Sequence, residues 1–459
     1  MILSISGILN NVSIFISMNI DNIRLFLLCL AWFSAIMNVI FGQSVFIFGN
    51  VGVLSLICFF VLTFRRLKKE SNFIILLLLI VAFIILDRIP SFEEFLSGGR
   101  FILVFSALLP TMILVRSVSI EVERVKISQN LLKKLPTQIS TSGFQIASHF
   151  FGSVINTGTF SILSAALPED CDKDYRKAIA EACLRGMNTS ATWSPFFVAF
   201  AVGQAFIDKT NSLIAIACGV FIGFLFNLIS LPIFAYGSTF KQIKLSLACL
   251  SPVVPILSLI MFSVLTVSLI FDFTALSAVV LVMPIMIFIY SVFNFKNISK
   301  IYYNSKSWLL NTSDDIIVIS IAMLIGHLIS RSNTINDYNI FINSSILPAW
   351  SFLTLTPLII TLFSFIGIHP IITSTIALSL LSSGQAAIHP ALLMQAHLVG
   401  WAGGTMSSVA SLSTLTCSNL FQVESRQLAF GPNLLTAVIF SLSSGFILSL
   451  VLSLMSKKI

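Results

Sequence analysis

The chain has 459 residues, of which 57% are hydrophobic and only 10% are charged, and its mean hydropathy is +1.00. Soluble domains carry about 25% charged residues, so this composition excludes a soluble domain of useful size. The formal net charge of +8 is typical of basic cytoplasmic loops and does not indicate nucleic-acid binding. We therefore predict an all-α, multi-pass protein of the cell (inner or plasma) membrane.

Several kinds of function lack a sequence signal. The seven cysteines lie mostly inside apolar runs and form no CxxC pair, so we expect neither a disulfide framework nor a metal site. The first 24 residues have no basic start and no clear cleavage site, so we predict no cleaved signal peptide. No Walker motif is present, which argues against ATP hydrolysis. We expect no cofactor.

Apolar runs of about 20 residues, long enough to cross the hydrocarbon core, recur along the chain. The basic segments 65–69 and 116–134 are placed in the cytoplasm and the acidic loop 87–94 outside. Residues 121–135 predict a short amphipathic helix along the interface. The first four predicted spans lie near 25–42, 44–64, 72–88 and 100–116.

The next segment decides the topology. Residues 143–167 are predicted to form a hairpin that dips into the membrane and returns to the cytoplasm. Residues 178–207 then cross outward as a broken helix, and 212–239 return. This path leaves Lys241 and Lys244 inside, as the positive-inside tendency requires.

The second half contains the same kinds of element. Predicted spans lie near 247–271, 273–293, 308–330 and 427–455, a broken span at 388–422, and a second hairpin at 346–384 that is interrupted at 367–370. The basic segment 294–306 is placed inside and the polar loop 332–345 outside. The total is about eleven transmembrane helices and two re-entrant hairpins, with Lys457 and Lys458 outside.

Two stretches, 100–239 and 308–459, share the order helix, hairpin, broken helix, helix in opposite orientations. We predict that they are inverted repeats, with N-terminal spans in 1–99 and connecting spans in 240–307. Inverted repeats place a substrate site near the membrane midplane at their interface. Local sequence agrees weakly, since Thr192-x-Ser194 in one repeat corresponds to Thr405-x-Ser407 in the other.

Several motifs resemble those of the ion transporter superfamily, most closely its divalent anion:sodium symporter family. Residues 155–159 (INTGT) resemble a Ser-Asn-Thr hairpin motif, with Ile155 in place of serine. Residues 190–195 resemble the family's first helix break, and 367–370 its Gly-x-His-Pro signal. Residues 411–419 lack the paired prolines, and 346–384 lack a second Ser-Asn-Thr. The resemblance implies transport of a di- or tricarboxylate with Na⁺, and a homodimer.

The candidate binding residues supply hydroxyl and amide groups at the hairpin tip and the two helix breaks. Such groups, with exposed helix ends, suit an anion or Na⁺. The alternative is that small residues only allow close helix packing. The candidates are Asn156, Thr157, Thr159, Asn188, Thr189, Ser190, Thr192, Ser194, Thr405, Ser407, Ser413 and Thr414.

Two further residues are candidate partners for an anion or a proton. An intramembrane arginine normally faces a cavity or a partner. Arg185 could therefore neutralise an anionic substrate, or equally pair with Glu181 one helical turn earlier. His369 in the second hairpin could carry a proton if it faces the cavity.

These features predict a secondary active transporter of a small anion, coupled to Na⁺ or H⁺, whose partners are that anion and the lipid bilayer. We predict no enzyme activity. The alternative is an integral-membrane enzyme acting on a lipid or lipid-linked sugar, using the acidic residues of 87–94 with Arg100, or those of 169–174. A channel is the third possibility, but it should show a continuous polar stripe instead of local interruptions.

Overall fold

The computed structural model describes residues 2–42, 46–168, 170–234, 239–329, 348–382 and 388–456. All regular secondary structure in these ranges is helical, which confirms the all-α prediction for them. The predicted outer loop 332–345 and the two C-terminal lysines lie outside the described residues.

Six described helices are long and apolar enough to cross a membrane. A seventh span results if the bent pair 295–311 and 313–329, which meet at 54°, is counted as one. Three shorter helices are also apolar. These helices are those of a membrane-embedded protein, whereas the count of eleven spans stays a prediction.

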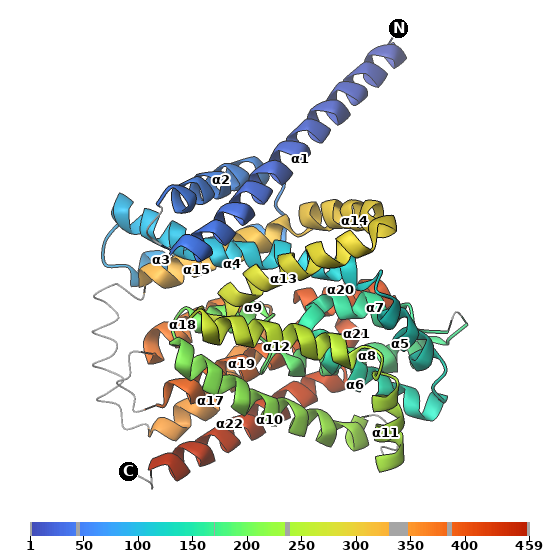
Figure 1. The fold of residues 1–459 in the computed structure, drawn as a ribbon. Coiled ribbons are helices and arrows are strands. Elements are labelled where there is room, and N and C mark those ends of the chain that lie inside the picture. The colour runs from blue at the N-terminus through green and yellow to red at the C-terminus, as the bar shows by residue number, and fades with distance from the viewer. Residues whose placement is uncertain are drawn as a thin grey trace.

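One group of helices, here called the α4 group, packs around α4 (Phe92–Ser119) in the upper part of Figure 1. Helix α4 begins at a capping box in which Ser91 and Glu94 each accept the other's backbone N–H. It continues through Pro110, which membrane helices tolerate when neighbours satisfy the freed backbone groups. The other members are α1 (Ile2–Phe41), α2 (Phe46–Phe64), α3 (Lys69–Ile85), α13 (Ala275–Phe293), α14 (Ile298–Asn311) and α15 (Ser313–Ile329).

The second group, here called the α19 group, lies below it and surrounds α19 (Pro390–Ser407). Its other members are α6 (Thr137–Ile155), η2 (Asn156–Gly158), α7 (Thr159–Ser164), α8 (Lys173–Ser190), α9 (Val198–Gln204), α10 (Lys209–Phe234), α11 (Phe240–Ala248), α12 (Val254–Ile270), α17 (Ala349–Phe365), α18 (Pro370–Leu381), α20 (Leu412–Phe421), α21 (Ser425–Phe430) and α22 (Pro432–Ser456). The short α5 (Glu123–Lys133) packs on α6 and α7. The groups meet where α4 contacts α6, η2 and α9, where α13 contacts α9 and α12, and where α15 contacts α18.

Four helical segments of the α19 group are interrupted close to where the sequence places hairpins and broken spans. The chain turns at η2 between α6 and α7, and at 366–369 between α17 and α18. Helix α8 ends at Ser190 and α9 begins at Val198, while α19 ends at Ser407 and α20 begins at Leu412. The interruption between α8 and α9 is buried throughout, whereas the turn at 366–369 lies near the surface, with Ile366 68% exposed.

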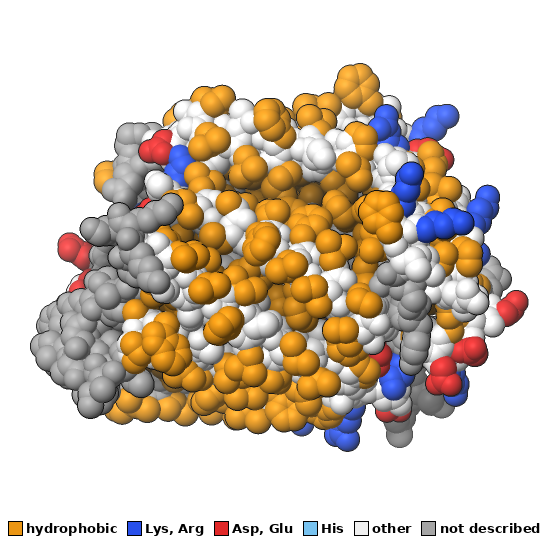
Figure 2. All heavy atoms as spheres, turned by 90° about the horizontal axis from the view of Figure 1, so that it is seen from below, with side chains coloured by type: hydrophobic (Ala, Val, Ile, Leu, Met, Phe, Trp, Pro, Cys, Tyr) orange, Lys and Arg blue, Asp and Glu red, His pale blue; other side chains and the backbone are white. Residues whose placement is uncertain are grey.

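The surface is apolar where the helices face outward. Exposed large side chains such as Phe83, Phe262 and Phe446 are 89%, 69% and 69% exposed. Figure 2 shows apolar side chains across the middle of one face and Lys and Arg gathered toward one end. This pattern is that expected for helices that face lipid and end in basic loops.

The segment 294–306, which the sequence places inside, is mostly helical. Most of it belongs to helix α14, which bends by 54° into α15. Residues such as Ile301, Ser305 and Leu309 form a buried stripe at helical spacing. Packing of this stripe, including a Ser305–Ser117 hydrogen bond to α4 at 2.8 Å, stabilises a helix there.

Candidate functional site

The hairpin tip at η2 has a strained backbone. Asn156 has φ 56° and ψ −137°, a conformation that non-glycine residues rarely adopt. Its side-chain oxygen accepts the Thr157 N–H at 2.7 Å, which fixes the amide against the turn. Thr157 is half-buried, and the fully buried Thr159 hydroxyl has no hydrogen-bond partner among the described residues. The tip therefore combines strain with an unsatisfied polar group.

At the first break, three hydroxyls bond mainly to the backbone of their own segment. Ser190 donates to Met187 O at 2.7 Å, Thr192 to Thr189 O at 2.8 Å, and Thr189 to Gly186 O at 2.9 Å. Such back-bonding satisfies the hydroxyls and loosens helical geometry. These three residues are almost fully buried, so they face protein in this conformation.

The first break is also bonded to helix α6. The Ser194 hydroxyl donates to the Ser153 carbonyl, and Trp193 Nε1 donates to His149 Nε2 at 3.2 Å. Because an indole N–H can only donate, His149 Nε2 must be unprotonated and Nδ1 carries the hydrogen. Nδ1 lies 3.2 Å from Gly186 O and 3.1 Å from Thr189 Oγ1. His149 is therefore a neutral link between α6, α8 and the break.

The second break is held by bonds within its own segment. Ser411 donates to Thr405 O at 2.6 Å and caps α20 by accepting the Thr414 N–H at 3.1 Å. Thr414 also donates to Thr405 O at 3.2 Å, and Ser407 donates to Gly403 O at 2.9 Å. Ser413 is buried in the first turn of α20.

The two breaks meet through one side-chain hydrogen bond. Thr405 Oγ1 donates to Asn188 Oδ1 at 2.7 Å, across 217 residues of sequence. Each residue lies two positions before the end of its helix, α8 or α19. Two helix C-termini, which carry partial negative charge, therefore face each other at this contact. That polarity favours a cation over an anion between them.

Arg185 is 2% exposed and bonds to neutral groups. It donates to Gln145 Oε1 at 3.2 Å and to Asn433 Oδ1 at 2.8 Å, and its guanidinium lies 5.0 Å from the centre of the Phe234 ring. No hydrogen bond joins it to Glu181 in the described part of the chain, and Glu181 lies instead 3.9 Å from Lys177. Glu181, one helical turn earlier, still interacts electrostatically with Arg185, as the structural alternative expected, but the hydrogen bonds of the guanidinium go to amides.

His369 acts as a helix cap. Its Nδ1 accepts the Ile371 N–H at 3.2 Å at the start of α18. His389 does the same for α19, accepting the Ala391 N–H at 3.3 Å. Each histidine precedes a proline at the first helical position, where the missing N–H is tolerated. In this arrangement Nδ1 is already occupied as an acceptor.

The structure brings Arg116 to the hairpin tip, which the sequence interpretation missed. Arg116 Nη2 donates to Ser161 Oγ at 2.5 Å, and its guanidinium lies 4.1 Å from the centre of the Trp308 ring. Its side chain also packs on Gly158, where an added Cβ would lie 2.9 Å from Arg116 Cγ. The sequence placed Arg116 in a cytoplasmic segment because the predicted span ended there, whereas α4 continues to Ser119. Only a longer predicted helix at this position would have indicated that Arg116 lies within α4.

Two of the acidic residues of the enzyme alternative, Asp172 and Glu94, have structural roles. Asp172 caps α8 by accepting the Tyr175 N–H at 2.6 Å. Glu94 closes the capping box of α4 and pairs with Arg88 at 2.6 Å. Neither observation favours catalysis.

Fold and site together define the class as a helical membrane protein with interrupted helices in its interior. Compared with known proteins, the sequence matches no family model and no curated protein. The argument for function therefore depends on the site.

Proposed function

We propose that the protein is a secondary active transporter of a small anion, such as a di- or tricarboxylate, in the cell (inner or plasma) membrane. The observation that carries the transport proposal is the Asn188–Thr405 hydrogen bond of 2.7 Å between two interrupted helices. The anionic substrate is proposed from the family resemblance and from Arg116 beside the hairpin tip. Interrupted helices at membrane depth are tolerated where they border protein or a polar cavity, and in transporters they form the substrate site.

The contacts of the hairpins support the proposed inverted repeats. Helix α20, which follows the second break, contacts α7 and η2 of the first hairpin. Helix α18 of the second hairpin contacts α9, which follows the first break. Each hairpin thus contacts the broken span of the other half, which is the pattern that a pseudo-two-fold axis in the membrane plane would produce. In the proposed mechanism, the α19 group moves against the α4 group to expose the site alternately.

For the coupling ion we propose Na⁺ before H⁺. Buried hydroxyls of Thr159, Ser374, Thr375 and Ser379 have no hydrogen-bond partner among the described residues, and hydroxyl oxygen is a ligand suited to Na⁺. The facing C-termini of α8 and α19 add negative polarity. His149 and His369 already use the nitrogen that a coupling proton would need. His397 is the competing proton carrier, because its buried Nδ1 has no partner in the described structure.

For the anion we propose that Arg116 is a better partner than Arg185. Arg185 is enclosed by two amides and an aromatic ring. Arg116 lies beside the hairpin tip, and its buried Nε has no hydrogen-bond partner among the described residues. A homodimer is proposed from the family resemblance alone.

The test is uptake of labelled succinate and citrate into proteoliposomes containing the purified chain, driven by an inward Na⁺ gradient at equal pH and then by a proton gradient without Na⁺. We expect accumulation in the first condition. Thr405→Val should lower it about ten- to a hundredfold, because it leaves the Asn188 oxygen without this partner, a loss of about 1–3 kcal/mol. Ser443→Ala, at an exposed hydroxyl of α22, is the matched control.

Three results would count against the proposal. If neither succinate nor citrate were taken up under a gradient, di- and tricarboxylates would be ruled out as the substrate class. Downhill leak without accumulation would indicate a channel. Normal uptake by Thr405→Val would show that the meeting of the two breaks is not the site.

A further inference from the structure

A cavity of about 570 Å³ lies inside the α4 group, away from the breaks and the hairpin tip. Its size is that of a small-molecule site. One stripe of α4 forms a wall, with Ser97, Arg100, Phe101 and Val104 at helical spacing. Asn38, Phe46, Thr274, Ser277 and His327 complete most of the lining. None of the residues assigned to transport lies in it.

Arg100 gives this cavity its chemistry. It is half-buried, and no hydrogen bond or ion pair reaches its guanidinium in the described part of the chain. Its neighbour is the Phe46 ring, whose centre lies 5.5 Å away. An aromatic face attracts the charge but accepts none of the five N–H donors in a conventional hydrogen bond. The guanidinium is therefore available to an oxygen-rich anion, and the Ser97 hydroxyl lies on the same helix face.

With α4 taken as centred in the bilayer and parallel to its normal, the depth of Arg100 fits a lipid phosphate. Helix α4 has 28 residues, about 42 Å at 1.5 Å per residue, so about 6 Å extends past each side of a hydrocarbon core about 30 Å thick. Arg100 lies about 12 Å from the first residue of α4, or about 6 Å inside that boundary. A long arginine side chain spans such a distance by extending toward the headgroups.

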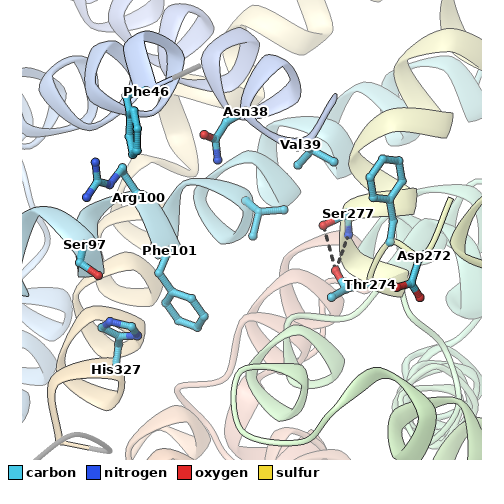
Figure 3. Close-up of a pocket in the computed structure, with 12 residues that line it drawn as sticks. Asn38, Val39, Phe46, Ser97, Arg100, Phe101, Asp272, Thr274, Ser277 and His327 are labelled. Atoms are coloured by element: carbon cyan, nitrogen blue, oxygen red, sulfur yellow. Dashed lines mark hydrogen bonds between the residues drawn. The ribbon is translucent and has the colours of Figure 1, made fainter. Parts of the chain in front are cut away.

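The rim of the cavity carries exposed aromatic side chains beside one exposed carboxylate, Asp272, whose side chain is 93% exposed. Phe46, a lining residue, is 57% exposed, and Phe41 and Phe271 next to the lining residues are 48% and 61% exposed. A ligand with acyl chains could enter sideways over these aromatic side chains. The one carboxylate of the lining, Asp272, lies on the opposite side from Arg100 (Figure 3) and pairs with Lys209 at 2.5 Å. Its charge is therefore offset.

We propose that this cavity is a phospholipid site, in which the phosphate of an anionic phospholipid binds the Arg100 guanidinium. The acyl chains lie against the exposed phenylalanines of the rim. The Ser277 hydroxyl lines the same cavity; its oxygen accepts the Thr274 hydroxyl at 2.9 Å, and its own hydrogen can donate to a polyol headgroup such as glycerol (Figure 3). This site is independent of the transport proposal, and each can fail without the other.

The experiment is native mass spectrometry of the delipidated full chain in detergent, titrated with phosphatidylglycerol or with diacylglycerol of the same acyl chains. We expect diacylglycerol, which lacks the phosphate, to bind at least about tenfold more weakly. Arg100→Gln should weaken phosphatidylglycerol binding by a similar factor. Arg88→Gln is the matched control, because Arg88 lies in the loop before α4 with its side chain 60% exposed.

The two lipids are compared on the unmutated protein, so the test does not depend on folding of the variant. Equal binding of diacylglycerol would overturn the proposal, as would unchanged binding by Arg100→Gln. Equal losses in Arg100→Gln and Arg88→Gln would also overturn it, since they would report surface charge alone. Glycerol 3-phosphate, the same headgroup without acyl chains, separates a lipid from a free anion. If it bound as tightly as phosphatidylglycerol, the lipid assignment would be wrong.

Discussion

The two interrupted helices differ in what holds their non-helical segments in place. The first segment, between α8 and α9, bonds to other elements through Ser194 with α6, Trp193 with His149, and Thr192 with Gly219 O of α10 at 3.1 Å. The second, between α19 and α20, bonds mostly to Thr405 O of its own helix. The first break is thus part of a rigid unit with its neighbours, whereas the second can rearrange with fewer tertiary bonds lost.

Backbone packing shows the same asymmetry. A Cβ on Gly219 of α10 would lie 1.9 Å from the Thr192 carbonyl oxygen, which belongs to the first segment. A Cβ on Gly404, close to the second segment, would instead meet the Ser364 hydroxyl at 2.5 Å. The Ser364 hydroxyl can rotate away, so that only its Cβ, 2.9 Å from the added atom, must shift slightly, whereas at Gly219 a backbone carbonyl held in a packed core must move. The first segment is therefore the more tightly enclosed of the two.

The largest predicted effect follows from this difference. Gly219→Ala should destabilise the protein by about 3 kcal/mol or more, at the upper end of the range for overpacking, because backbone must shift. Gly404→Ala should destabilise the protein less, by about 1–2 kcal/mol, because the Ser364 hydroxyl can rotate and its Cβ needs only a small shift. Apparent melting temperatures in detergent, followed by size-exclusion chromatography after heating, measure both. Equal losses would mean that the two segments are equally constrained.

The second prediction separates strain from function at the hairpin tip, which contacts α20 after the second break. Asn156→Gly should retain or raise the melting temperature, because glycine adopts φ 56°, ψ −137° without the 1–3 kcal/mol of strain, roughly, that other residues bear there. Asn156→Ala keeps that strain and loses the bond to the Thr157 N–H, so it should be the less stable variant. Both should lose uptake if the amide binds substrate or ion. Normal uptake by the glycine variant would assign Asn156 to the turn alone.

Local sequence patterns located the interruptions but not the bonds between them. Clusters of Asn, Thr, Ser and Gly mark helix ends because their side chains compete for backbone hydrogen bonds, and α8 ends at Ser190 within such a cluster. The His-Pro pairs at 369–370 and 389–390 likewise coincide with helix starts. Such signals depend only on neighbouring residues, so they predict helix ends without knowledge of the packed structure.

The partners of the site residues lie far away in sequence, and periodicity says nothing about them. Asn188 and Thr405 were both candidates, but only the packed structure pairs them. His149, which bonds Trp193 from 44 residues away, was not among the candidate residues. Arg185 was expected to face a carboxylate or an anion, yet it bonds to Asn433, 248 residues later. A single sequence contains no pattern that predicts which distant amide side chain a given residue will bond.

The smallest predicted effect compares two serine hydroxyls, one in each break. Ser194→Ala removes a bond between the first segment and the Ser153 carbonyl of α6, whereas Ser411→Ala removes the cap of α20 and a bond to Thr405 O. Each substitution should lower the free energy of unfolding by about 1 kcal/mol, so the melting temperature alone will not distinguish the two variants.

Hydrogen exchange will distinguish them, because local opening shows which backbone amides lose protection. Ser194→Ala should raise exchange both in 191–197 and at the C-terminal end of α6, since the bond joins them. Ser411→Ala should raise exchange only in the first turn of α20. If Ser194→Ala left α6 unchanged, the first break would be as self-contained as the second, and the hairpin and the broken helix could not be treated as one moving unit.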